Sequence, residues 1–291
     1  MSTHVEPAPT PNKPDDPNRR FSAAWNKDFA IRHAMVIVML LIIAYFSYRS
    51  ARFATLDNFQ SIAIAAAPFA LIAIGQTLVI LTGGIDLSVG SVIAVSAMTA
   101  AAIVKDHPER LVFGILAGVL AGLVCGAING FLVAQVKVPP FIATLGMLTT
   151  ASGFAYVIGG GAPINGLPEN FGDLANTKIL GVQRPVWVMI IGIVVMGIIM
   201  ARTSYGMRVY AVGGNTSAAK LAGIKTKRIL FSVYALSGLL AGLSGVLLAS
   251  RVISGPPNLG QGYELDAIAA VVIGGASLLG GRGTIWGTAL G

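Results

Sequence analysis

The chain has 291 residues, of which 55% are hydrophobic and only 11% are charged, whereas soluble domains contain about 25% charged residues. Too few polar residues remain to cover a soluble globular surface, so the composition predicts a membrane protein with several spans and excludes a large soluble domain. The net charge of +8 would suit a nucleic-acid-binding protein. The basic residues are dispersed over loops between apolar runs, however, and membrane topology explains them better.

The N-terminal region, residues 1–32, contains no apolar run that could serve as a signal peptide. Its segment "EPAPTPNKPDDPNRR" is rich in proline and charge, which is typical of disorder. We therefore predict a disordered tail over 1–32, followed by a single transmembrane domain over 33–291.

Apolar runs define the predicted spans, because about 20 apolar residues cross a bilayer as a helix. In chain order they cover residues 33–48, 61–81, 89–104, 111–135, 141–159, 185–201 and 229–250, and an eighth run, broken by glycines, begins near Ala267. The predicted fold is an all-α polytopic membrane bundle with about eight spans. Cys125 is the only cysteine, so no intrachain disulfide can form.

The stretch "LTGGIDLSVGS" places a carboxylate in this apolar sequence. Asp86 is the only charged residue within 61–104, and an aspartate at the centre of a membrane helix costs about 2.5 to 3.5 kcal/mol. Gly83 and Gly84 interrupt helical propensity, and Asp86 and Ser88 are suited to cap a new helix. We predict a break between two helices that faces protein or a water-filled cavity.

Two interpretations of Asp86 remain open on the sequence. In the first, Asp86 is a helix cap and a carboxylate anchor that fixes the broken helix. In the second, Asp86 lies close enough to a translocation pathway to bias it toward polar substrates. Proton coupling would need a titratable partner within the spans, and the runs supply none beyond His33 at an edge.

The loop over 202–228 contains six Lys or Arg residues and no acid, which predicts a cytoplasmic location by the positive-inside rule. Six spans precede it, so the N-terminus is also predicted to be cytoplasmic. The loop over 160–184 then lies outside. Its mixture of Pro, Gly, Asn and charges indicates a structured surface loop with a short helix.

Within the basic loop, "NTSAAKLAGIKTKRI" predicts a short helix through Ala218 and Ala219 that ends at Gly223. We expect both alanines to be exposed, in a shape that could insert into a groove on another protein. The alternative is an ordinary basic loop without a partner.

A second glycine-rich segment, "GYELDAIAAVVIGGASLLGGRGTIWGTALG", lies near the C-terminus. Glu264 and Asp266 precede small residues and paired glycines. This order is the counterpart of the Asp86 segment, and paired broken helices are typical of an internal repeat around a central pathway.

Four segments resemble the permease subunit of bacterial ribose-type ABC sugar importers. They are "LTGGIDLSVGSVIA", "VPPFIATLGML", "GGNTSAAKLAGIKTKRILFSVYALSGLLAGLSGVLLASR" and the glycine-rich segment near the C-terminus. The resemblance runs in order from about Phe59 to Gly291. It implies a two-copy channel in the bacterial inner membrane, a periplasmic sugar-binding protein outside and ATPase subunits inside.

The resemblance also assigns roles in the basic loop. Ser217, Ala218, Ala219 and Gly223 match the "EAA…G" signature of the coupling helix that meets the ATPase, with Ser217 in place of the family's acidic residue.

Gly83, Gly84, Asp86 and Ser88 match the family's "GGIDLS" segment beside the translocation path. Relatives usually continue beyond the position of Gly291, which implies one or two further spans.

The chain is expected to perform no catalysis and to need no cofactor. It lacks the phosphate-binding pattern "GxxxxGK[ST]", and its spans contain no Ser/His/Asp set or metal-ligand cluster. The function predicted is translocation of a monosaccharide by alternating access, driven by ATP hydrolysis on another chain. The rival hypothesis is a self-sufficient secondary transporter or channel for a small polar solute that uses Asp86.

Overall fold

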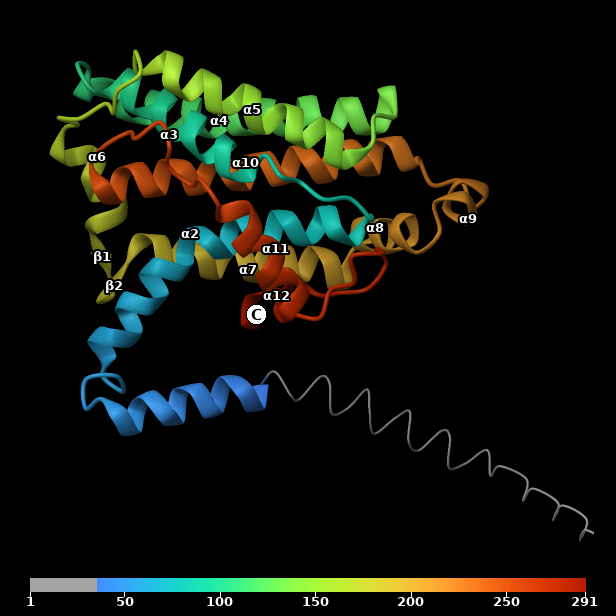
Figure 1. The fold of residues 1–291 in the computed structure, drawn as a ribbon, viewed down its shortest axis with the longest axis horizontal. Helices are drawn as coiled ribbons and strands as arrows, with labels where there is room; N and C mark the ends of the chain where they lie inside the picture. Colours follow the sequence, from blue (N-terminus) through green and yellow to red (C-terminus); the bar gives the residue numbers. More distant parts are fainter. Residues whose placement is uncertain (1–35) are drawn as a thin grey trace, which may run out of the picture. The chain divides into compact units, whose positions relative to one another are not determined.

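The computed structural model describes residues 36–291, so the predicted tail over 1–32 lies outside the described residues. The chain divides into two units, residues 1–45 and 46–291. A helix, Val36–Arg49, begins in the first unit. The second unit contains the other helices of the described residues (Figure 1).

Five described helices are long and apolar enough to cross a membrane. They are α2 (Leu56–Leu81), α4 (Leu111–Phe131), α5 (Pro140–Ile158), α7 (Arg184–Arg202) and α10 (Thr226–Val252). The 3₁₀ turn Pro108–Arg110 precedes α4, and the π-helical turn Leu132–Val136 extends it. The predicted all-α membrane bundle is confirmed, and these helices correspond to predicted spans.

The shorter elements complete the bundle. They are α3 (Val89–Val104), α6 (Glu169–Asn176), α8 (Ser204–Gly214), α9 (Thr216–Leu221), α11 (Tyr263–Ile273) and α12 (Ile285–Leu290), with strands β1 (Lys178–Ile179) and β2 (Val182–Gln183) paired antiparallel. The expected short helix of the 160–184 loop is α6, and the β-hairpin is additional. Helix α8 was not predicted, because its polar and glycine residues gave the sequence the composition of a loop.

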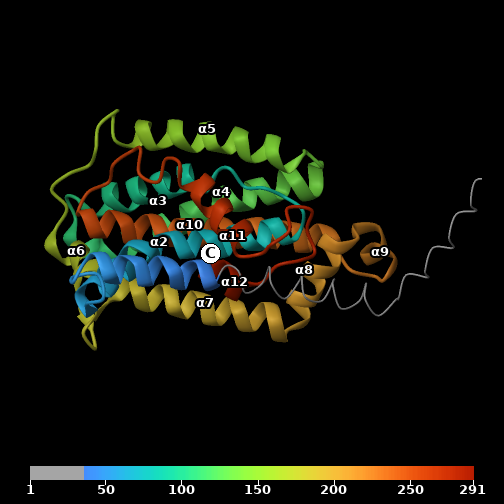
Figure 2. The same ribbon diagram turned by 60° about the horizontal axis from the view of Figure 1, so that its bottom comes forward.

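The bundle has two opposite ends, visible in Figures 1 and 2. At the end that we call the hairpin end, the start of α2 meets the β-hairpin through a bond from Gln60 Nε2 to the Gly181 carbonyl (3.3 Å). The end of α10 meets α6 there, because Ser250 Oγ donates to the Phe171 carbonyl (2.6 Å). At the opposite end, which we call the α9 end, lie the end of α2 and helices α8 and α9.

Helix α4 packs through a face made almost entirely of glycine. Glycines at every fourth position from 114 to 130 are buried. A Cβ atom at Gly122 would lie 2.6 Å from the Gly242 Cα of α10, so only glycine permits this approach of the two backbones. The opposite face carries exposed large side chains such as Phe113 and Leu120. Helix α4 therefore presents small residues to the protein and apolar bulk to its surroundings.

Candidate functional site

The first broken segment follows α2. Helix α2 ends at Leu81, Gly83 adopts a positive φ of 79°, and residues 82–88 turn back without helical structure before α3 begins at Val89. At Gly84 the chain passes so close to the buried Tyr234 hydroxyl that a Cβ atom there would force its neighbours to shift. The predicted helix break is confirmed, and both glycines have a steric reason.

The Asp86 carboxylate is enclosed by hydroxyl and amide donors and is only 1% exposed. Its Oδ1 accepts from the Ser88 backbone N–H (2.9 Å) and from Ser88 Oγ (2.6 Å). Its Oδ2 accepts from Ser237 Oγ of α10 (3.1 Å). Hydrogen bonds to a charged group are among the stronger ones, so the carboxylate joins the break to α10.

Three further polar side chains hold the same segment from other helices. Asn129 of α4 donates from Nδ2 to Ser88 Oγ (2.9 Å), and Thr144 of α5 donates to the Ile85 carbonyl (3.2 Å). With its amide oriented to satisfy both groups, Gln76 of α2 donates to the Asp86 carbonyl (3.1 Å) and accepts from the Asp86 N–H (3.2 Å). Four helices thus supply backbone or side-chain partners to a non-helical segment, as a buried break requires.

The capping prediction is correct in part. Ser88 occupies the cap position of α3, but its side chain makes no capping bond. Asp86 instead supplies the acceptor, to the N–H of Ser88. The partners Gln76, Asn129 and Ser237 were missed. The signal that could have found the first two is an amide inside an otherwise apolar run.

The second broken segment follows α10 and runs the opposite way. Helix α10 ends at Val252 at the hairpin end, residues 253–262 return into the bundle, and α11 begins at Tyr263. Helix α3 runs from the interior to the hairpin end, whereas α11 starts in the interior and crosses the bundle obliquely, away from that end. Their first turns meet, since Gly90 lies directly against the Gly260 carbonyl and the Glu264 carboxylate. We call α3 and α11 opposed half-helices, because both begin inside the bundle and meet at their first turns; the internal repeat suggested by the order of acid, small residues and paired glycines stays a prediction.

A glycine junction joins the first broken segment to the loop that follows α11, at the α9 end. The Gly281 N–H donates to the Leu81 carbonyl (2.9 Å). A Cβ atom at Gly280 would lie 2.9 Å from the Gly213 carbonyl of α8 and 3.0 Å from the Gly83 nitrogen. The loop after α11, the break after α2 and helix α8 therefore touch backbone to backbone.

Helix α9 forms as the sequence predicts. The Asn215 side chain caps its start by accepting from the Ala218 N–H (2.9 Å). Gly223 has a φ of 79°, which confirms the expected turn-forming glycine. Ser217 and Ala218 are exposed, and Leu221 is 91% exposed.

The expectation that Ala219 is exposed is wrong. Ala219 is 4% exposed and belongs to the main hydrophobic core, and its carbonyl accepts from the Ile224 N–H (3.0 Å). A six-residue helix that caps a membrane bundle must turn one face inward, and only small residues let it lie so close. Of the four predicted coupling residues, Ala219 therefore faces this chain rather than a partner.

Comparison with known proteins agrees with this architecture. Residues 58–291 match the family described as "Branched-chain amino acid transport system / permease component". The chain is 42% identical to the Escherichia coli K12 ribose import permease protein RbsC over 277 residues, 94% of this chain and 85% of that protein. It is 47% identical to Bacillus subtilis RbsC over 223 residues, 76% of this chain and 69% of that protein.

A relative named for another pentose is also similar. The L-arabinose ABC transporter permease protein AraH of Azospirillum brasilense is 37% identical over 294 residues, covering 100% of this chain and 86% of that protein. No solved structure matches significantly. The chain therefore belongs to the family of ABC importer permeases that includes the ribose and L-arabinose permeases.

Proposed function

We propose that this chain is the membrane-spanning subunit of a bacterial importer that moves a monosaccharide across the inner membrane, driven by ATP hydrolysis on a separate subunit. The names of the relatives, for ribose and L-arabinose, support a sugar substrate. The structural observation that carries the proposal is α9, a capped helix with an exposed leucine at the end of the bundle that holds the basic loop.

In this proposal the α9 end is cytoplasmic and receives the ATPase, and the N-terminus lies on the same side. The six basic residues over 202–228 and the absence of acids there support this orientation. The hairpin end then faces the periplasm and receives the sugar-binding protein. The outward apolar faces of α4, α5 and α7 would contact lipid and a second permease copy.

The glycine junction offers a route from the ATPase to the pathway. Helix α8 leads into α9 and touches Leu81 and Gly281 through its Gly213. A displacement of α9 would therefore reach the break after α2 and the loop after α11 through backbone contacts, with no flexible side chain between them.

For Asp86 we propose the anchor role. Its buried carboxylate accepts three hydrogen bonds from Ser88 and Ser237, and a coupling group for a secondary transporter would need access to water from each side in turn. The pathway interpretation and the secondary transporter remain the alternatives to be tested.

The test of the ATPase-docking role uses Leu221→Glu and Ala218→Trp. Both side chains are exposed, so the amount of inserted protein should stay unchanged while ATPase copurification and sugar uptake are lost. A groove packed around α9 tolerates neither a buried charge nor added bulk, which typically cost more than about 1 kcal/mol. Leu180→Glu, at a leucine 87% exposed at the hairpin end, is the matched control and should retain the ATPase.

If both α9 variants retain the ATPase and normal uptake, the docking assignment fails. If the purified chain alone accumulates solute in vesicles that contain no ATPase, the secondary-transporter hypothesis replaces the proposal.

A further inference from the structure

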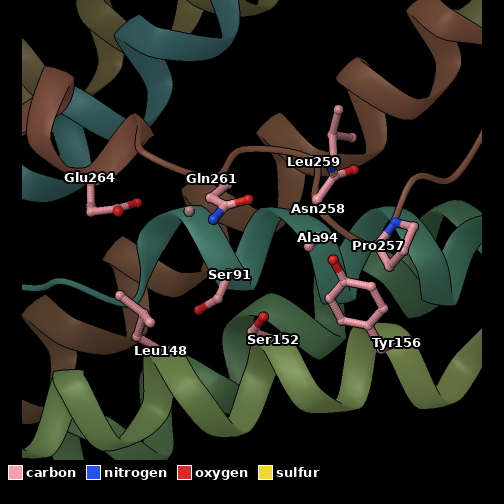
Figure 3. A pocket seen from close by; sticks show the side chains of 11 residues that line it. Ser91, Ala94, Leu148, Ser152, Tyr156, Pro257, Asn258, Leu259, Gln261 and Glu264 are labelled. Carbon is pink, nitrogen blue, oxygen red and sulfur yellow. The ribbon is translucent and has the colours of Figure 1, made fainter. Parts of the chain in front are cut away.

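A cavity of about 180 Å³ opens between α3, α5 and the second broken segment (Figure 3). Six polar side chains line it, and they come from three separate stretches of the chain. These are Ser91, Ser152, Tyr156, Asn258, Gln261 and Glu264. Figure 3 shows Ser91 and Ser152 in the space between α3 and α5, with Asn258, Gln261 and Glu264 on the second broken segment along α3.

Most of these groups have unused hydrogen-bonding capacity. Within the described part of the chain, no protein group bonds to the side chains of Ser152, Asn258, Gln261 or Glu264, whereas Ser91 Oγ donates to the Ser88 carbonyl (2.8 Å) and keeps its lone pairs. Hydroxyls, amides and a carboxylate together offer both donors and acceptors. Such a set matches a ligand that carries many hydroxyl groups.

Glu264 gives the cavity its charge. It lies in the first turn of α11 and against the first turn of α3 at Gly90, so the N-terminal ends of two helices stabilise its carboxylate. None of the residues that line the cavity is basic. The site therefore disfavours anionic ligands, and the neutral charge of the solute comes from the proposed function.

We propose that this cavity is a solute-binding site of the permease itself, for a neutral polyhydroxylated solute of monosaccharide size. The proposal rests on the proposed function for the identity of the solute and names its class. Hydroxyl groups of the sugar pair with Glu264, Asn258, Gln261 and Ser152, and the exposed ring of Tyr156 supplies an apolar face for its C–H groups. The first turns of α3 and α11 form one wall of the cavity. The glycine junction connects the break before α3 and the loop after α11 to α8. Binding of solute in the cavity is therefore linked to α8.

The test measures protection of a cysteine. Ser152→Cys is placed in a Cys125→Ala background, and the purified full chain is labelled with a maleimide in the presence of D-ribose, L-arabinose, D-xylose or D-galactose. Bound sugar slows labelling by the factor 1 + [L]/Kd, or about tenfold at roughly nine times the Kd. Thr149→Cys, at an exposed position of α5 outside the cavity, should label at an unchanged rate. D-ribonate, the anionic analogue of ribose, should protect neither cysteine.

The charge is tested by adding Glu264→Gln to the Ser152→Cys variant. The Kd for sugar should rise about tenfold, because a charge-assisted hydrogen bond becomes a neutral one, and ribonate should begin to protect. Absence of protection by all four sugars, or equal protection by ribose and ribonate with Glu264 present, would overturn the proposal. Labelling needs neither ATPase nor transport. Protection without ATP-driven uptake would therefore count against the proposed function alone, and uptake without protection would count against the cavity alone.

Discussion

At the scale of single residues, Asp86 shows how a carboxylate is accommodated inside an apolar bundle. Its two oxygens accept three hydrogen bonds, from Ser88 and from Ser237 of a distant helix. Without such partners a buried charge would be strongly unfavourable. With them, the same carboxylate fixes both the turn that begins α3 and the position of that turn against α10.

Two substitutions of Asp86 separate its role as a structural anchor from a role of its negative charge in transport. Asp86→Asn keeps a side-chain oxygen for Ser88, so folded yield and uptake should be nearly normal if Asp86 acts as an anchor. Asp86→Leu leaves the Ser88 and Ser237 donors buried without an acceptor, at about 1 to 3 kcal/mol each, and should lower the yield and the unfolding temperature in detergent. The control Asp57→Leu removes an exposed acid in the first turn of α2 and should cost less than about 1 kcal/mol. A stable Asp86→Asn protein that fails to transport would favour the pathway interpretation.

The sequence identified Asp86 and Ser88 but not the partners that come from other helices. A lone charge in an apolar run is conspicuous, whereas Ser237 lies among the many small residues of α10, and only its position beside the break distinguishes it. The error at Ala219 has a similar origin. The composition of a loop does not tell which face of a short helix turns inward, because that depends on helices far away in the chain.

At the scale of elements, helix α4 depends on glycine at its contact with α10. A Cβ atom at Gly126 would lie 2.8 Å from the Gly238 Cα, so Gly126→Ala should force the helices apart at a cost of about 1 to 3 kcal/mol. Gly146 of α5 has open space around its Cβ position. There the same substitution should be neutral, or should stabilise the helix by about 0.5 to 1 kcal/mol.

Thermal unfolding in detergent, followed by size-exclusion chromatography, compares the two variants directly. Equal unfolding temperatures would show that α4 and α10 can move apart without penalty, contrary to the close packing of their backbones. If Gly146→Ala keeps its unfolding temperature but elutes as a single copy rather than as a dimer, α5 lies at the contact with a second copy.

The elements themselves were largely predictable. A span is defined by the length of its apolar run. The runs at 89–104 and 185–201 became helices with closely similar bounds, and the run at 61–81 became α2, which begins earlier, at Leu56. Helix α8 was not predictable, because its sequence "SYGMRVYAVGG" contains no long apolar run. Its place is set by packing against Leu81 and Gly281, which a single sequence does not reveal.

At the scale of the whole molecule, the two broken segments form an opposed pair. Each consists of a long helix, an extended return and a half-helix that begins inside the bundle. In transporters such pairs place the solute where the half-helices meet. The cavity beside Gly90 and Glu264 lies at that meeting point. The proposed solute site is therefore built from the same half-helices whose ends the glycine junction connects to α8.

The orientation of this structure in the membrane decides which partner each end meets. The loop over 202–228 has six basic residues and no acid, whereas the loop over 160–184 balances two bases with two acids. Positive charge is retained on the cytoplasmic side, so we expect α9 inside and the hairpin outside. Leu221 and Leu180 are well placed to report this, since they lie at opposite ends and are 91% and 87% exposed.

Each leucine is replaced by cysteine in a Cys125→Ala background, and cells are treated with a membrane-impermeant maleimide. Leu180→Cys should be labelled in intact cells, and Leu221→Cys only after the inner membrane is opened. Both variants should be labelled equally in detergent, which controls for reactivity. The reverse pattern in intact cells would place α9 outside the cell, where an ATPase has no ATP to hydrolyse. That result would rule out ATPase docking on α9, and with it the proposed direction of transport.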